Sequence, residues 1–529
     1  MLKKSYYVAP TELDQVVFEK LVPPDHYLRQ VKAVIDFERF RAEVRDCYSP
    51  HMGRGAEDPV RMVKLEFLEI HYNLSDREVI AEAQVNVAFR YFLDLSLDSP
   101  LPVPSLLSQF RTRLGVDRHQ GLLQAVVGQA RAYGLVQDRL RLKDATHVIA
   151  NIAIPSAIQL VAQMRDRLLQ ALRPYTPERV TAAREQARAI HQATADLKDE
   201  DRLLQRVAHL RQIVAGADAV VAEWGADPAA GGPARPRLEE VLAWAHHVLA
   251  DQDDPDKGDR LRSVTDPNAR RGKHGGYYDG YALDISMDAE SELLTAVEVL
   301  PANGDEAADA AALLTTEEAA HGNRVQAVSM DGIGFRGDVL RELGNPQGLA
   351  VTVYVPVWDW SSQARGGFQP PDFTLNAERT VLRCPGGQET ARRTRHADDN
   401  GWSFRFRRRL CAACELLPQC MPQLPHRDGR QVLKNDYEAE YLAARARAQG
   451  PEYAAVRAQH PKVERKLAEI VRYHGGRRAR YRGRWRTKVQ YLLTALVVNI
   501  KRMVRLLGAR PAPGAGVCRA GCVGAVVSG

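Results

Sequence analysis

Asp144 lies in a segment whose residue types could do chemistry. Between residues 139 and 154 the apolar pattern has a period of two, which predicts a β-strand. Leu142, Asp144, Thr146 and Val148 share one face of this strand, so an aspartate takes a position where Val or Leu is expected. An inward-facing carboxylate needs hydrogen-bond donors or a cation beside it. Asp144 is therefore a candidate site residue.

Asp331 is a second candidate because it ends another predicted strand. The mainly apolar segment 325–330 (VQAVSM) precedes it and Gly332 follows it. Ends of strands in α/β sheets are where ligand-binding groups are presented. Asp144 and Asp331 would lie on neighbouring strands in such a topology.

The third candidate, Glu464, comes from a predicted helix that spans residues 452–473. With Leu467 set at zero on a helical wheel, Glu464 lies about 60° away and Glu469 about 200° away. We therefore expect Glu464 to border the buried face and Glu469 to point to solvent.

Three converging carboxylates can hold two Mg²⁺ ions, of which one activates the attacking oxygen and the other stabilises the leaving oxygen. Hard oxygen ligands suit Mg²⁺, or Mn²⁺, and leave coordination positions for phosphate. The predicted reaction is phosphoryl transfer on DNA. The alternative is that Asp144 and Asp331 are ordinary buried or strand-end carboxylates.

A basic segment follows this helix. From Ile470 to the end the chain has 13 of its 73 Lys and Arg and no Asp or Glu, which leaves 60 basic against 66 acidic residues elsewhere. Such asymmetry favours a polyanion as partner, with salt-dependent contacts to phosphate. The candidate DNA-binding residues are Arg472, Arg477, Arg478, Arg480, Arg482, Arg484, Arg486 and Lys488. The alternative is a solvated basic helix end.

Four of the seven cysteines, Cys384, Cys411, Cys414 and Cys420, fall in one short window. Four thiolates are the number that a structural Zn²⁺ takes in tetrahedral geometry. Reduced structural cysteines are the alternative. Cys518 and Cys522 lie in a low-complexity tail, and Cys47 is interpreted as an isolated core thiol.

The elements that must position these residues predict an α/β (mixed) fold in several units. Residues 1–136 read as short helices, and arginines at positions 77, 90, 111 and 113 fit a DNA-binding module or, alternatively, a dimerisation domain. Strands and one helix alternate in residues 137–154 and 263–360, and helix returns in 451–508. Residues 155–262 form a helical insertion, 361–450 an Arg/Cys-rich insertion, and 509–529 a disordered tail.

The composition is that of a globular protein, with 45% apolar and 26% charged residues. The longest uncharged apolar run near the basic end, residues 491–500, is too short for a span, which needs about 20 residues. The N-terminus lacks the apolar core of a signal peptide. We expect a cytoplasmic, nucleoid-associated protein with no membrane partner.

Five segments resemble bacterial insertion-sequence transposases of the DDE class. They begin at Leu21 (LVPPDHYLR), Lys143 (KDATH), Leu294 (LTAVEVLPAN), Asp331 (DGIGF) and Val463 (VERK), in the same order as in that family. The resemblance covers nearly the whole chain except the tail.

This resemblance implies an RNase H-like catalytic core with an N-terminal helical DNA-binding domain and a metal-binding triad at Asp144, Asp331 and Glu464. It implies that Asp288 and Asn303 are neighbours of the site, and that Thr146 and His147 orient the first aspartate, contact DNA or are ordinary strand residues. The implied partners are the terminal inverted repeats of the element and target DNA, bound by a homodimer. Water would attack the phosphodiester first, and the freed 3′-hydroxyl would then attack target DNA.

The chain departs from the family around the last acid. Many relatives carry Tyr-x2-Arg-x3-Glu-x6-Lys, whereas these positions hold Arg457, His460, Glu464 and Val471. The DNA-contacting roles of that Tyr, Arg and Lys therefore do not transfer, and Arg457, Arg472 or Arg477 are candidate substitutes. The alternative function is a catalytically inactive, transposase-derived DNA-binding or regulatory protein.

Overall fold

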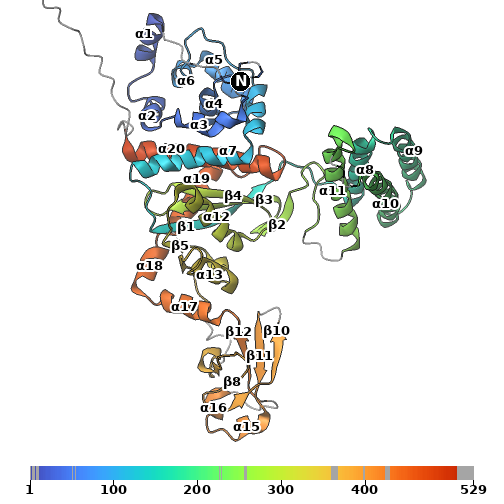
Figure 1. The fold of residues 1–529 in the computed structure, drawn as a ribbon, viewed down its shortest axis with the longest axis vertical. Helices are drawn as coiled ribbons and strands as arrows, with labels where there is room; N and C mark the ends of the chain where they lie inside the picture. The colour runs from blue at the N-terminus through green and yellow to red at the C-terminus, as the bar shows by residue number, and fades with distance from the viewer. Residues whose placement is uncertain are drawn as a thin grey trace, which may run out of the picture.

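The computed structural model describes residues 2, 6, 11–49, 52–53, 55–225, 227, 229–254, 259–358, 367–396, 400–422 and 429–508. Helices of the N-terminal part lie above a central sheet, a helical module projects to one side, and a small β-rich module lies at the far end (Figure 1). The predicted class, mixed α/β with N-terminal helices, is confirmed. The tail after Gly508, with Cys518 and Cys522, lies outside the described residues.

Local sequence signals explain where the N-terminal helices begin. Asp58 caps one of them by accepting a hydrogen bond from the Val60 amide, and the Ser75/Glu78 capping box predicted for the next helix is present. The predicted stop at Gly115 is a kink, since its φ of 63° breaks the helical geometry inside a longer helix. The helices are α1 (Glu12–Leu21), α2 (Tyr27–Val34), α3 (Arg39–Val44), α4 (Pro59–His71), α5 (Asp76–Val85), α6 (Val87–Phe92) and α7 (Ser105–Ala132).

Two of the four arginines that suggested DNA binding have structural roles instead. Arg90 is buried and donates to the carbonyl oxygens of residues 84, 96 and 99. Arg111 is buried and pairs with Glu69 and Asp76. Arg77 and Arg113 are exposed. The N-terminal arginine pattern was therefore partly a signal of buried ion pairing.

The central sheet has the order β2-β3-β1-β5-β6, and β4 also pairs with β3. β3 is antiparallel to both of its neighbours, β1 and β4. β5 runs parallel to β1, and β6 runs parallel to β5. This is the RNase H-like arrangement that the resemblance implied. The strands are β1 (Leu140–Ile149), β2 (Arg270–His274), β3 (Gly276–Asp288), β4 (Leu294–Pro301), β5 (Ala327–Ser329) and β6 (Thr352–Tyr354).

β1 is buried on both faces, which its alternating pattern did not predict. Leu142 and Val148 are fully buried on one face, and Arg141 and Lys143 are buried on the other. Arg141 pairs there with Asp288 at 2.9 Å and with Glu317 of α12 (Glu306–His321) at 2.5 Å. Asp288 thus holds β1 in place from a neighbouring strand.

The long C-terminal helix α20 (Arg484–Leu507) joins the N-terminal helices to the sheet. It packs against α4, α7 and β4, and its apolar side chains share one continuous core with both regions. The apolar run at residues 491–500 is buried in this core. Within the described ranges, no helix is long and apolar enough to cross a membrane.

The helical module between β1 and β2 has a core of its own. Its helices are α8 (Ala157–Leu172), α9 (Pro177–Ala193), α10 (Asp199–Trp224) and α11 (Arg235–Asp253). Both connections to the sheet meet at one point, because Ile149 of β1 and Arg270 of β2 pair with Gly280 of β3 from opposite sides.

Residues 367–435 form a small β-rich module, whose strands are too short for a period of two to be recognised. Two three-stranded sheets, β7-β8-β9 and β10-β11-β12, carry its structure. The elements are β7 (Thr374–Leu375), β8 (Leu382–Arg383), β9 (Glu389–Thr390), β10 (Arg393–His396), β11 (Gly401–Arg405), α15 (Arg408–Ala412), α16 (Leu417–Cys420) and β12 (Gln431–Asn435). The next helix, α17 (Glu438–Ala448), packs against α13 (Gly337–Gly344) and β6, and its Glu438 pairs with Lys434 of β12 at 2.6 Å.

Candidate active site

Asp144, in the middle of β1, and Asp331, just beyond the end of β5, lie level with each other on two parallel strands. Leu142 of β1 is paired with Ser329 of β5, so each aspartate is two residues beyond that pair. Asp144 is half-buried, and its Oδ1 accepts a hydrogen bond from the Ala145 amide at 2.8 Å. The register of the two strands thus brings the first two predicted acids together.

Asp331 stands where the backbone leaves the sheet. It precedes the short 3₁₀ turn η3 (Gly332–Gly334) with an extended backbone, and its side chain does not cap that turn. Its carboxylate accepts no hydrogen bond from any of the described residues. A half-buried carboxylate without donors is suited to a cation.

Glu464 lies in the first turn of α19 (Pro461–Tyr473), which packs against β1. Burial, together with the negative charges of Asp331 and Glu464, raises the pKa of Asp144 to about 6. The three predicted acids therefore lie in the same region of the fold, but in the part of the chain that the structure describes no group of three or more His, Cys, Asp or Glu side chains is arranged to hold a metal ion.

The angular argument that chose Glu464 was wrong about the exposure of both glutamates. Glu469 is half-buried and pairs with Lys466 at 2.9 Å and with Lys501 of α20 at 3.0 Å, whereas Glu464 is exposed. The reason is that α19 also turns a side towards α20, so Lys466 and Ile470 are buried together with Leu467. A helix wheel centred on one residue misses a second packing partner.

A fourth carboxylate, Glu306, escaped the sequence analysis. It is the first residue of α12, and burial raises its pKa, as does the charge of Asp331. Lys143 contacts the start of α12: its Nζ donates to the Glu306 carbonyl oxygen and pairs with the buried Asp284 at 3.0 Å. Only the tertiary fold reveals this neighbour, because Glu306 follows an ordinary helix-capping aspartate, Asp305.

Arg457 and His460, which stand at the positions of the family's Tyr and Arg, contact the end of β5. Arg457 donates to Ser329 Oγ at 2.8 Å and to the Met330 carbonyl oxygen at 2.5 Å. His460 is buried, with Nδ1 3.3 Å from Ser329 Oγ, and burial lowers its pKa to about 4. These residues hold the backbone that leads into Asp331.

The basic segment divides into two groups. Arg472, Arg478, Arg482 and Arg486 are exposed. The other four predicted DNA-binding residues bond within the protein: Arg477 to Thr146 and His147, Arg480 to Glu69, Asn73 and Leu74, and Arg484 and Lys488 to Glu298. Arg482, although exposed, also donates to the Asn151 carbonyl oxygen at 3.1 Å, so five of the eight predicted residues join the C-terminal segment to the fold.

Three further residues that the resemblance placed near the site contact other parts of the protein: Thr146, His147 and Asn303. Thr146 Oγ1 and the His147 carbonyl oxygen accept from Arg477, and the His147 ring packs against the rings of His274 and Tyr278. Asn303 donates to Asp259 Oδ1 at 3.2 Å. These contacts are structural.

The four clustered cysteines line one small cavity in the β-rich module, together with Phe373, Phe406 and Arg430. They are free thiols. Within the described residues, no group of three or more His, Cys, Asp or Glu side chains is arranged to hold a metal ion. The four thiols line the same cavity, but their sulfur atoms are not arranged around a common metal position.

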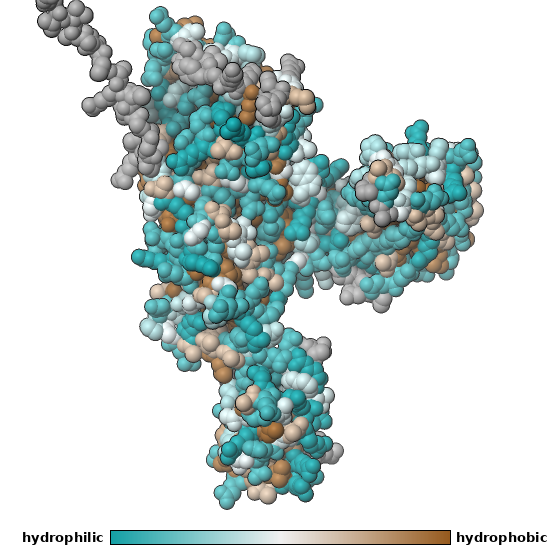
Figure 2. Space-filling model, viewed as in Figure 1, coloured by the Kyte–Doolittle hydropathy of each residue, from teal (hydrophilic) through white to brown (hydrophobic). Residues whose placement is uncertain are grey.

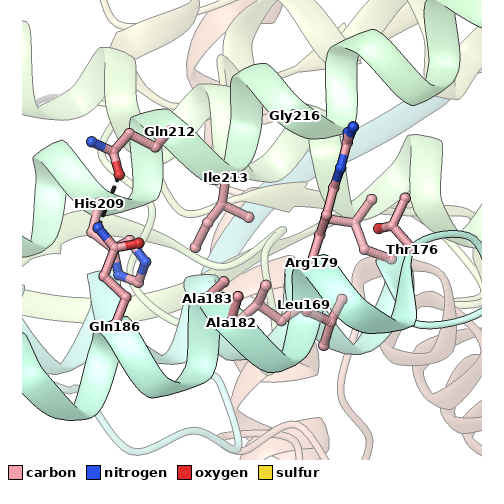
Figure 3. Close-up of a pocket in the computed structure, with 12 residues that line it drawn as sticks. Leu169, Thr176, Arg179, Ala182, Ala183, Gln186, His209, Gln212, Ile213 and Gly216 are labelled. Carbon is pink, nitrogen blue, oxygen red and sulfur yellow. Dashed lines mark hydrogen bonds between the residues drawn. The ribbon is translucent and has the colours of Figure 1, made fainter.

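A larger cavity of about 250 Å³ lies in the helical module, far along the chain from the carboxylates. Leu169, Ala183 and Ile213 line it, with Ile213 of α10 pointing in opposite Ala183 of α9, and Gln186 and Gln212 hydrogen-bond at one end (Figure 3). It contains no carboxylate and no thiol.

On the visible face of the whole molecule, hydrophilic residues predominate and hydrophobic ones are scattered (Figure 2).

Two family models match the chain. The Transposase domain (DUF772) covers residues 16–113, which are the N-terminal helices, and the Transposase DDE domain covers residues 383–504, which include Glu464. Together they support an insertion-sequence DDE transposase, as the motifs indicated. No curated protein and no solved structure matches the chain. Asp144 and Asp331 lie outside both matched segments.

Proposed function

We propose that this transposase binds the ends of an insertion sequence and catalyses Mg²⁺-dependent strand cleavage and strand transfer. The observation that supports this most is the placement of Asp144 in β1 and Asp331 just beyond β5, with Glu464 on α19, which packs against β1. Three oxygen donors of like charge, two of them half-buried, repel one another unless a cation lies between them.

The donor set fits Mg²⁺ or Mn²⁺, which prefer hard oxygen ligands. Asp144, Asp331 and Glu464 would hold the metal, and Glu306 would add negative charge beside Asp331. When bound, the metal supplies an activated oxygen nucleophile and stabilises charge on the leaving oxygen. The protein holds the carboxylates in position: Arg457 fixes the backbone before Asp331, and the strand pairing fixes Asp144.

DNA would reach this site along the N-terminal helices and along exposed arginines that extend from the end of α19 to the start of α20. Arg472, Arg478, Arg482 and Arg486 are exposed and can pair with phosphates. We propose that these contacts hold the inverted repeats, that a homodimer holds two ends, and that the protein acts on DNA of the bacterial nucleoid in the cytoplasm.

The test is cleavage of a labelled element end with Mg²⁺ by wild type, Asp144→Asn, Asp331→Asn and Glu464→Gln. The control is Glu342→Gln, which changes an exposed glutamate of α13. We expect each triad variant to lose cleavage by at least a hundredfold while it still binds the DNA end, and the control to cleave like wild type. Equal cleavage by all variants would refute the triad, and binding without cleavage by wild type would refute catalysis.

A further inference from the structure

The β-rich module at residues 367–435 has a very small apolar core. Its buried cluster consists of Phe373, Leu382, Phe404, Phe406 and Val432. Segments of this size seldom fold on so few core side chains without a disulfide or a metal. The described cysteines are all free. The module therefore lacks an evident source of stability.

Its cysteines come from three turns that face one another. Cys384 closes the turn between β8 and β9, where the Gly387 amide donates to the Cys384 carbonyl oxygen at 2.9 Å. Cys411 and Cys414 form a second turn at the end of α15, with the Cys414 amide 3.1 Å from the Cys411 carbonyl oxygen. Cys420 ends α16. All four side chains line one cavity of about 30 Å³.

The surroundings of the sulfur atoms suit thiolates. The Arg430 amide donates a hydrogen bond to Cys411 Sγ at 3.4 Å. A Cβ atom on Gly386 would lie 2.9 Å from Cys414 Sγ and 3.8 Å from Cys384 Sγ, so the absence of a side chain there lets two turns approach.

We propose that Cys384, Cys411, Cys414 and Cys420 together bind one structural Zn²⁺ ion, which stabilises the β-rich module. Four thiols release their protons on binding, and side-chain rotations bring the sulfurs to about 2.3 Å from the ion. Zn²⁺ is the ion of choice because thiolates are soft ligands and the set offers tetrahedral coordination without an open position.

The zinc content of the full chain, purified under reducing conditions in zinc-containing buffer and then dialysed, tests this proposal. We expect about one Zn²⁺ per chain. We expect Cys411→Ser/Cys414→Ser to lose it, whereas Cys47→Ser and the tail variant Cys518→Ser/Cys522→Ser keep it. Absence of stoichiometric zinc from wild type, or its loss from the tail variant instead, would overturn the proposal.

A second measurement does not depend on the folding of any variant. Wild type reconstituted with Co²⁺ should show the thiolate charge-transfer and ligand-field bands of a tetrahedral four-sulfur site, and Zn²⁺ should abolish them. A cobalt spectrum without thiolate bands would contradict the proposal. Limited proteolysis should cut the module faster after chelation. Since none of these readouts uses DNA, they stand or fall separately from the proposed cleavage activity.

Discussion

Arg477 donates a hydrogen bond to the carbonyl oxygen of His147 at 2.6 Å, and this bond joins the loop after α19 to the strand that carries Asp144. Two backbone bonds reinforce it: the Ile149 amide donates to the Arg477 carbonyl oxygen, and the Ala479 amide to that of Ile149, each at 2.9 Å. The helix with Glu464 is therefore held against β1 by the segment that immediately follows it.

Replacement of Arg477 should affect positioning more than DNA affinity. Arg477→Ala leaves the His147 carbonyl oxygen without its side-chain donor, which should lower the free energy of unfolding by about 1–3 kcal/mol and the cleavage rate by about tenfold. Thermal unfolding and single-turnover cleavage measure these effects. Arg478→Ala, its exposed neighbour, is the matched control and should leave the unfolding temperature unchanged. A larger loss of stability and cleavage rate in Arg478→Ala than in Arg477→Ala would contradict the positioning role of Arg477.

The exposed arginines should determine how DNA binding depends on salt. Alanine at Arg472, Arg478, Arg482 or Arg486 should each reduce the slope of log K against log salt concentration by about 1, if the residue contacts one phosphate. Anisotropy titrations of a labelled element end at several salt concentrations give the slope. Lys488→Ala serves as comparison, because Lys488 pairs with Glu298 at 2.6 Å and should change the slope less. If all variants had the same slope of log K against log salt concentration, the DNA would not contact these arginines.

Gly280 should not tolerate a side chain. A Cβ atom there would lie 2.0 Å from the Val148 carbonyl oxygen and 2.7 Å from the Ala150 amide nitrogen, and neither backbone atom can move freely. We expect Gly280→Ala to cost about 3 kcal/mol or more of unfolding free energy, measured by urea denaturation. Gly276→Ala, on the same strand with open space around its Cβ, should cost about 1 kcal/mol or less. Similar losses for both would mean that β1 and β3 are further apart.

His71 should make stability depend on pH. Burial lowers its pKa from 6.5 to about 4, with the charges of Lys501 and His474 acting in the same direction. Between these values the unfolded chain binds the extra proton, so this contribution is fully present above about pH 6.5 and is lost as the pH falls towards 4.

The variant His71→Phe tests that dependence. It keeps the ring stacked on Tyr27 and Phe67 and removes a buried Nδ1 that has no hydrogen-bond partner. Its unfolding free energy should fall less than that of wild type between pH 6.5 and 5, and His246→Gln, at an exposed histidine of α11, should behave like wild type. An unchanged pH profile for His71→Phe would show that other groups dominate.

Patterns that depend on neighbours in sequence were predictable, and those that depend on distant packing were not. Hydrophobic period and capping residues predicted the helices. The inward-facing position in an alternating strand pointed to Asp144, the strand-end position pointed to Asp331, and family motifs supported both. The solvent-facing orientation expected for Glu469 failed because Lys501 approaches from α20, which is far along the chain. Arg480 appeared to be a DNA contact because its bonds to Glu69, Asn73 and Leu74 span more than 400 residues.

Because β1 and β2 both pair with Gly280, the connection between these two strands is a suitable place to insert another domain. Strands on either side of a shared neighbour are about 10 Å apart, so the polypeptide leaves and re-enters the sheet within the width of a single helix. Any domain whose termini are that close could occupy this junction. A fluorescent protein inserted there would be attached to the central sheet. Its fluorescence would measure how far the sheet moves when two transposon ends are brought together.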